Sequence, residues 1–139
     1  MRVFVDANIL VSVLNKEYPL FSNTARIISL ADHKKFTIFT SSVCLAIAFY
    51  FAEKKSSTLQ AKQKLGMLAS KLSIAGIGKK EVEKSLANKQ INDFEDGIQY
   101  YAAIENKCSV IITEDTEDYY FSAIEVLDAE TFLKKYVLK

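Results

Sequence analysis

Acidic side chains occupy three separated places in this 139-residue chain where carboxylates could act together. Asp6 follows the apolar residues Val3–Val5, Asp96 lies in the segment DFEDGIQYYAAI, and Asp115 follows the apolar run CSVIIT. Clustered carboxylates without histidine or cysteine favour a hard divalent cation such as Mg²⁺ or Mn²⁺. Holding such like charges together without an ion is costly. The predicted chemistry is therefore metal-assisted, with Asp6, Asp96 and Asp115 as candidate catalytic ligands.

The helix expected to carry Asp96 begins with several polar residues. Asn92 and Glu95 have the three-residue spacing of an N-cap and its reciprocal partner, so both are interpreted as structural. Asp93 and Asp96 are also three residues apart and share one side of a helix. Asp93 is therefore a further candidate metal ligand.

Each acid also has a purely structural interpretation. Asp6, in the sequence DAN, is suited to cap the helix that follows it, and Asp115 and Asp118 are suited to a solvated loop. Acids in a first helical turn are favoured by the helix dipole alone. Taken singly, each acid leaves both interpretations open, whereas their combination favours a metal site.

These acids need a scaffold that brings distant segments together. Short apolar segments alternate with amphipathic ones, which is typical of an α/β domain with a central, mainly parallel sheet flanked by helices. The expected strands cover residues 3–5, 36–40, 108–113 and 124–127, with a brief extended segment at 73–78. The expected helices cover residues 8–16, 21–31, 43–52, 58–72, 79–87, 93–106 and 129–137.

Two of these elements carry specific expectations. The strand at 108–113 should be central and fully buried, and the nearly all-apolar helix at 43–52 should be buried on most sides. Ligands of open α/β sheets gather beyond the carboxyl ends of the strands. If the first strand and the 108–113 strand are neighbours, Asp6 and Asp115 lie at the same edge.

Composition limits the class of protein. Lys and Arg number 18 and Asp and Glu number 17, so the net charge of +1 predicts no particular partner. The length and a hydrophobic fraction of 50% suit a single domain over residues 1–139. Cys44 and Cys108 lie in apolar surroundings without CxxC spacing, which indicates buried free thiols in a cytoplasmic protein. The longest apolar run is too short to span a bilayer, so no membrane is expected as a partner.

The motifs VFVDANIL, DFEDGIQYYAA and VIITEDTEDY give the chain a family resemblance. In this order they resemble a PIN domain, and within that family the VapC type of toxin ribonuclease. The resemblance covers nearly the whole chain, including TSSVCLAIAFYF and IEVLDAETFL. It implies a three-layer α/β/α PIN-like domain that cleaves RNA with Mg²⁺ or Mn²⁺.

The resemblance also assigns residues by position. The acids of the family's site correspond to Asp6, Asp96 and Asp115. Polar residues beside that site correspond to Asn8 and Thr113, and an acidic–aromatic pair after it corresponds to Asp118 and Tyr119.

The chain departs from the family at one acidic position, usually Glu, in the helix after the second strand. Ile47 or Ala48 stands there, and neither side chain binds a metal. Glu53 lies more than a turn further on and is a poor substitute, whereas Asp93 could compensate. The departure favours an alternative, a degenerate, catalytically weak PIN domain that acts as an RNA- or protein-binding module. A response-regulator-like phosphoacceptor is disfavoured because the strand IEVLD offers no lysine.

The resemblance implies an RNA substrate, a small antitoxin protein and a homodimer, and the helix at 58–72 could form part of a partner surface. The pairs Lys34–Lys35 and Lys54–Lys55 are candidates for RNA phosphate contacts because they flank segments near the predicted site. Solvated helix ends are the simpler interpretation of these lysines. The tyrosine-containing segments YFAEK, IQYYAA and DYYFS could stack bases, or pack in the core or a dimer interface.

Overall fold

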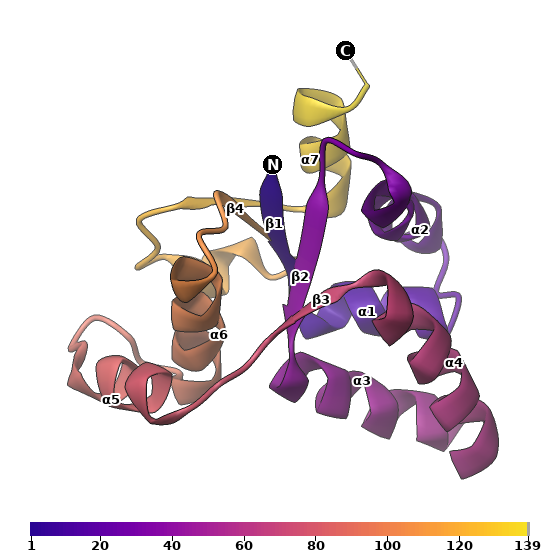
Figure 1. Cartoon of the computed structure of the whole chain (residues 1–139), viewed down its shortest axis with the longest axis horizontal. Coiled ribbons are helices and arrows are strands. Elements are labelled where there is room, and N and C mark those ends of the chain that lie inside the picture. The colour runs from indigo at the N-terminus through magenta and orange to yellow at the C-terminus, as the bar shows by residue number, and fades with distance from the viewer. Residues whose placement is uncertain (139) are drawn as a thin grey trace.

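A five-stranded sheet, parallel at every pairing, forms the centre of the computed structural model, which describes residues 1–138 (Figure 1). The strands are β1 (Arg2–Val5), β2 (Thr37–Ser41), β3 (Ser73–Ala75), β4 (Val110–Ile112) and β5 (Glu125–Leu127). Their order is β3-β2-β1-β4-β5. The predicted parallel sheet is confirmed, although β1 is the central strand and β4 is its neighbour.

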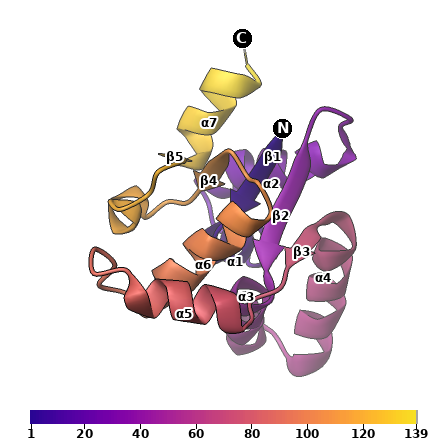
Figure 2. The same cartoon turned by 60° about the vertical axis from the view of Figure 1, so that its left-hand side comes forward.

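Helices cover both faces of the sheet. The α-helices of the described residues are α1 (Ala7–Leu14), α2 (Phe21–Ser29), α3 (Ser42–Lys55), α4 (Thr58–Lys71), α5 (Lys79–Ala87), α6 (Phe94–Glu105) and α7 (Ala129–Tyr136). Two short 3-10 helices are η1 (Leu30–Asp32) and η2 (Thr116–Tyr119). Helix α6, packed against α5, lies on one side of the sheet, and α1, α2 and α7 lie on the other (Figures 1 and 2). The predicted three-layer α/β/α architecture is therefore confirmed.

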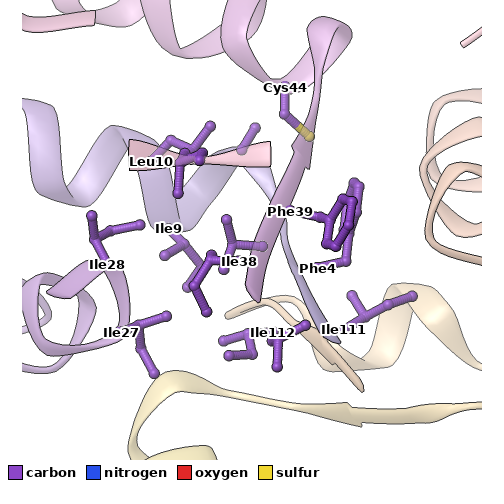
Figure 3. Close-up of a cluster of buried hydrophobic side chains, with 14 of the residues drawn as sticks. Phe4, Ile9, Leu10, Ile27, Ile28, Ile38, Phe39, Cys44, Ile111 and Ile112 are labelled. Atoms are coloured by element: carbon purple, nitrogen blue, oxygen red, sulfur yellow. The ribbon is translucent and has the colours of Figure 1, made fainter. Parts of the chain in front are cut away.

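Alternating side chains of the strands build the core on the two faces of the sheet. Phe4 is in register with Phe39 and with Ile111, so these three side chains share one face. Figure 3 shows Ile38 and Ile112 pointing the other way, toward the helices that follow β1 and precede β2. All three residues of β4 are buried, as its uninterrupted apolar sequence predicts.

Helix α3 differs from its expectation. The Ser41 hydroxyl caps it by accepting a hydrogen bond from the Cys44 backbone N–H at 3.0 Å. Its buried residues are only Cys44, Leu45, Ala48 and Ala52. Tyr50 and Phe51 are 51% and 45% exposed, so the expectation of burial on most sides is wrong. The uniformly apolar sequence does not indicate which side packs, and α1 and α4 cover only part of the helix.

Cys44 and Cys108 are both free and buried, as predicted. Within residues 1–138, no helix has both the length and the apolar character needed to cross a membrane.

Candidate functional site

A cleft of about 400 Å³ opens where β1 and β4 end side by side. Strand order reverses at this point, because the chain continues from β1 to β2 on one side and β4 lies on the other. The predicted acids Asp6, Asp96 and Asp115 all line this cleft. The full lining comprises Asp6, Ala7, Asn8, Val11, Glu17, Leu20, Ile47, Phe51, Asp93, Glu95, Asp96, Glu114, Asp115 and Asp118.

Asp6 serves both interpretations that the sequence left open. Its Oδ1 atom accepts a hydrogen bond from the Ala7 backbone N–H at 2.8 Å and caps α1. Its Oδ2 atom accepts hydrogen bonds from the Thr113 hydroxyl at 2.9 Å and the Tyr119 hydroxyl at 3.2 Å. These three donors fix the direction in which the carboxylate faces the cleft.

Thr113 and Asn8 connect the ends of the two strands. The Thr113 hydroxyl, which donates to Asp6, accepts hydrogen bonds from Asn8 Nδ2 at 2.9 Å and the Asp115 backbone N–H at 3.1 Å. Asn8 Nδ2 also lies 3.2 Å from Asp115 Oδ2, and its Oδ1 accepts from the Glu114 N–H at 3.1 Å. One fully buried hydroxyl thus contacts both the Asp6 carboxylate and the backbone N–H of Asp115, two residues at distant places in the chain.

The start of α6 corrects the assignment of its polar residues. Asp93, not Asn92, is the N-cap, and its Oδ1 accepts from the Asp96 backbone N–H at 3.2 Å. Glu95 was assigned to the cap but lines the cleft instead. Asp93 both caps α6 and lines the cleft, so one of its carboxylate oxygens already accepts a hydrogen bond from the Asp96 N–H. The close fit of α6 at Gly97, where a Cβ would meet Ser85 at 3.0 Å, fixes the helix position.

Three acids of the cleft, Asp6, Glu95 and Asp96, have raised pKa values. Desolvation, and then the charges of Asp93, Asp6, Asp118 and Glu95, raises the pKa of Asp96 to about 7. Desolvation also raises the pKa of Asp6, against the lowering effect of its hydrogen bonds, and raises that of Glu95. Eight of the fourteen lining residues are acids and none is Lys, Arg or His, so nothing in the lining balances this charge.

The chemistry of this lining fits a hard divalent cation. The donors are carboxylate and amide oxygens, which Mg²⁺ and Mn²⁺ prefer, and the charge they carry is uncompensated. Within residues 1–138, no three His, Cys, Asp or Glu side chains are already gathered as a metal-binding group. The carboxylates therefore surround the cleft without converging on one point.

Ile47 and Ala48, the two residues that the family resemblance places at a position usually held by an acid, have different surroundings. Ile47 lines the cleft, whereas Ala48 is fully buried in the core. The Glu53 carboxylate accepts a hydrogen bond from the Thr58 hydroxyl at 2.7 Å and does not line the cleft. Of these residues, Ile47 alone lines the cleft, where it presents an apolar side chain.

Other sequence-based expectations are corrected or extended. Lys34 and Lys35 precede β2, next to the chain's first residue, at the amino end of the sheet and away from the cleft.

Glu17 and Glu114 line the cleft but were not predicted. Glu114 also accepts from the Ala129 N–H at 3.0 Å, which ties the cleft to the start of α7. No local pattern marks Glu17, because it lies in the turn after α1.

Comparison with known proteins gives consistent matches. The family model described as "PIN domain" matches residues 2–117. Ribonuclease VapC1 of Aquifex aeolicus (strain VF5) is 29% identical over 142 residues, which cover 97% of this chain and 95% of that protein.

Two solved structures have the same fold. VapBC2 from Rickettsia felis, bound to a DNA fragment from its promoter, matches with a TM-score of 0.69 and 22% identity, over 92% of this chain and 98% of that chain. Mycobacterium tuberculosis VapC20, a toxin that cleaves the sarcin–ricin loop, matches with a TM-score of 0.66 and 13% identity, over 88% and 98%.

Proposed function

Because this chain belongs to the PIN domain family, we propose that it is a metal-dependent endoribonuclease and the toxin of a toxin–antitoxin pair. The observation that carries the proposal is a cleft lined by eight acids and no basic residue, at the strand-order reversal of a parallel sheet. The similarity to ribonuclease VapC1 over nearly the full length of both chains supports the same activity.

In this proposal, Asp6, Asp96 and Asp115 hold one or more Mg²⁺ or Mn²⁺ ions, and Asp93 assists from the start of α6. When bound, such an ion would supply Lewis-acid chemistry for activating a water and for stabilising charge on the scissile phosphate. Thr113 and Tyr119 keep Asp6 turned toward the cleft, and Asn8 does the same for Asp115. Asp118 adds negative charge near Asp96.

The test is RNA cleavage with Mn²⁺ by the protein and by Asp6→Asn. Asparagine is as good an N-cap as aspartate, so α1 should keep its start and the variant should fold. We expect cleavage to be lost while the variant still unfolds cooperatively. Its thermal unfolding temperature, Tm, should lie below that of the parent, because one acceptor oxygen of Asp6 is replaced by a donor. Equal cleavage by both proteins would contradict the proposal.

A second candidate function is a degenerate, catalytically weak PIN domain that acts as an RNA- or protein-binding module. The apolar side chain of Ile47 in the cleft favours it, because one fewer carboxylate is present to hold an ion. Calorimetric titration with Mn²⁺ separates the two functions. Binding at micromolar metal supports the nuclease, and no binding at millimolar metal supports the degenerate domain.

The proposed partners are an RNA substrate, a small antitoxin and a second copy of this chain. The VapBC2 structure is a toxin–antitoxin complex, which supports an antitoxin as a partner here. Leu59 and Met67 of α4 are 67% and 73% exposed and offer an apolar surface for a protein. The two buried free thiols suit a cytoplasmic location. Light scattering of the isolated chain tests the homodimer.

A further inference from the structure

The acids of the cleft come from two separate parts of the fold, and their like charge acts to push these parts apart. Three acids lie at the start of α6 and form what we call the helix side: Asp93, Glu95 and Asp96. Four lie at the end of β1 and in the segment after β4, and form what we call the strand side: Asp6, Glu114, Asp115 and Asp118. Charges of both sides act on Asp96. Because no basic residue lines the cleft, the two sides repel each other in the metal-free protein.

Hydrogen bonds orient acids of the strand side but not those at the centre of the helix side. The carboxylates of Asp6 and Asp115 accept from neutral side chains, as described above. In residues 1–138, no group donates a hydrogen bond to the carboxylate of Glu95 or Asp96, and Asp96 takes part in the cap only through its backbone N–H. The place of Asp96 in the cleft therefore depends on where α6 itself is held.

Tyr120 connects the residues just before α6 to the strand side. It directly follows η2, the 3-10 helix that contains Asp118. Its hydroxyl donates to the Gln90 carbonyl at 2.5 Å and accepts from the Asn92 backbone N–H at 3.2 Å. In the described part of the chain, these are the only hydrogen bonds that join residues 88–96 to a segment outside α5 and α6. Figure 2 shows the turn after α5 close to the segment that follows β4.

The hydroxyl of Tyr120 does more for the fold than its ring. The residue is 59% exposed, and its ring meets Phe121 edge to face with centroids 5.4 Å apart. Such an exposed ring contributes little to the core. The hydroxyl, in contrast, pairs one backbone acceptor and one backbone donor of the turn that leads into the Asp93 cap. It therefore fixes the backbone at the point where α6 begins.

We propose that Tyr120 is a positioning residue of the cleft, whose hydroxyl holds the start of α6 against the repulsion between the helix side and the strand side. Asp96 is thereby kept beside the carboxylates of Asp6 and Asp115. The inference rests on the proposed function and deepens it by naming a residue that controls the metal site without contacting the ion. Since a bound cation would itself offset the repulsion, the hydroxyl matters most before the ion binds.

Two other contacts of α6 have a different effect. Gln99 accepts a hydrogen bond from the Ser41 hydroxyl, and the Tyr100 hydroxyl accepts from the Ala123 N–H at 3.2 Å. Both contacts lie about one turn beyond Asp96, in the buried part of the helix. They hold the middle of α6 on the sheet, whereas Tyr120 holds the turn before its cap.

Hydrogen exchange of the metal-free protein, followed by NMR, tests the contact itself. We expect Tyr120→Phe to speed exchange of the Asn92 amide about 10-fold, because it removes the partners of this N–H and of the Gln90 carbonyl. Tyr101→Phe is the matched control, since the Tyr101 hydroxyl accepts from Asn88 Nδ2 at 3.1 Å and connects α5 only to α6. It should leave Asn92 exchange unchanged. Equal exchange in the parent and Tyr120→Phe would overturn the inference.

The charge dependence of the same exchange separates positioning against repulsion from simple support of a turn. Asp96→Asn removes one charge from the helix side, so adding it to Tyr120→Phe should bring Asn92 exchange back toward the parent rate. Salt at about 1 M, where the screening length is about 3 Å, should act in the same direction. If Asn92 exchanged equally fast in Tyr120→Phe with and without the Asp96 charge, and in low and high salt, the hydroxyl would not act against repulsion.

Calorimetric titration with Mn²⁺ tests the effect on the proposed metal site. Residues that support metal ligands typically contribute about 10–100-fold to affinity, and we expect Tyr120→Phe to bind about 10-fold more weakly, at the lower end of this range. Tyr101→Phe should bind like the parent.

The same titration separates failure of this inference from failure of the proposed function. If the parent binds Mn²⁺ and Tyr120→Phe binds it equally tightly, the inference fails and the proposed metal site stands. If the parent binds no Mn²⁺ at millimolar metal, the proposed nuclease fails, and the exchange of Asn92 alone decides whether Tyr120 positions α6.

Discussion

The two ends of α6 carry acids in opposite electrostatic environments. At the carboxyl end, Glu105 accepts hydrogen bonds from Lys80 and Lys84 of α5 at 2.9 and 3.0 Å, and these contacts lower its pKa. At the amino end, burial and neighbouring acids raise the pKa of Asp96 to about 7. The helix dipole alone favours negative charge at the amino end and disfavours it at the carboxyl end. Both shifts therefore oppose the dipole, and local neighbours determine the result.

Two groups of acids differ in this way, those that form ion pairs within the fold and those that line the cleft without a basic partner. Every ion pair in residues 1–138 uses a carboxylate outside the cleft, although the chain has 18 basic residues. The cleft acids accept hydrogen bonds from neutral groups instead, such as Thr113 and Tyr119. Neutral donors orient a carboxylate without cancelling its charge, so the charge stays available to a cation.

The largest effect should come from removing a charge at the amino end. Asp96→Asn should reduce RNA cleavage with Mn²⁺ by more than about 100-fold, because loss of a direct ligand exceeds the 10–100-fold cost of losing a supporting partner. Calorimetry should show weaker Mn²⁺ binding by the same variant. Glu105→Gln, at the other end of the helix, is the matched control and should cleave normally. Comparable losses in both variants would remove the distinction between the two ends.

A smaller effect should follow from removing an orienting donor. Thr113→Val leaves the shape of the side chain but removes the hydroxyl that donates to Asp6 and accepts from Asn8. We expect Mn²⁺ affinity to fall by about 10–100-fold. We also expect a loss of stability of about 1–3 kcal/mol, because buried donors lose their acceptor. Unchanged Mn²⁺ affinity, measured by calorimetry, would show that Asp6 does not need this contact.

The pH dependence of stability should distinguish the two ends in the metal-free protein. The pKa of Asp96 is about 7 in the folded chain, against an ordinary value of 3.8, so between these pH values the folded state binds more protons than the unfolded state. The Asp96 contribution to stability is therefore present at low pH and lost as pH rises toward 7. Since solvent screens a half-exposed group, we expect Tm in EDTA to fall by only about 2–4 °C across this range.

Glu105 contributes with the opposite sign, because its lowered pKa makes its contribution present above its ordinary value and lost in acid. Calorimetric scans of the parent and of Asp96→Asn check the assignment. The decrease in Tm with rising pH should shrink in the variant, and Mn²⁺ should reverse it in the parent by binding the deprotonated acids. If Tm decreased by the same amount in both proteins, a group other than Asp96 would cause the pH dependence.

The smallest effect on stability should come from the carboxyl end of α6, where Glu105 forms ion pairs. Glu105→Gln removes two exposed ion pairs, and such pairs contribute little in water. We expect Tm to fall by about 1–2 °C at pH 7 and less in high salt. Mn²⁺ affinity should not change, and a measurable loss would mean that the two ends are coupled through the helix.

Much of the fold could be predicted from the sequence because apolar segments and helix patterns are local signals. The apolar runs before Asp6 and Asp115 predicted two strands but left open whether they are neighbours. The structure pairs β1 with β4 in parallel, which brings their ends together. The cap of α6 could not be chosen in the same way. Asn92 and Asp93 are equally good N-caps, and the choice depends on the backbone conformation of Asp93.

The expectations for α3 and for Lys34 and Lys35 were wrong for the same physical reason. Local sequence does not determine where a residue lies relative to distant parts of the fold. The apolar run of α3 does not indicate which residues face α1 and α4, so the exposure of Phe51 was missed. Lys34 and Lys35 are close in sequence to β2 but lie at its amino end, whereas the cleft lies beyond its carboxyl end. Glu17 lies in a turn and reaches the cleft only through the packing of α1.

The hydrogen bonds of Asp6 have a consequence for the time at which the protein becomes active in a cell. Its partners Thr113 and Tyr119 lie 107 and 113 residues later in the chain. A ribosome makes Asp6 first, and the cleft cannot assemble on the nascent chain until Tyr119 has emerged. Because pairing between such distant segments is also slow to form, a growing or prematurely terminated chain carries no assembled cleft. Any activity of the cleft can therefore begin only when synthesis of the chain is almost complete.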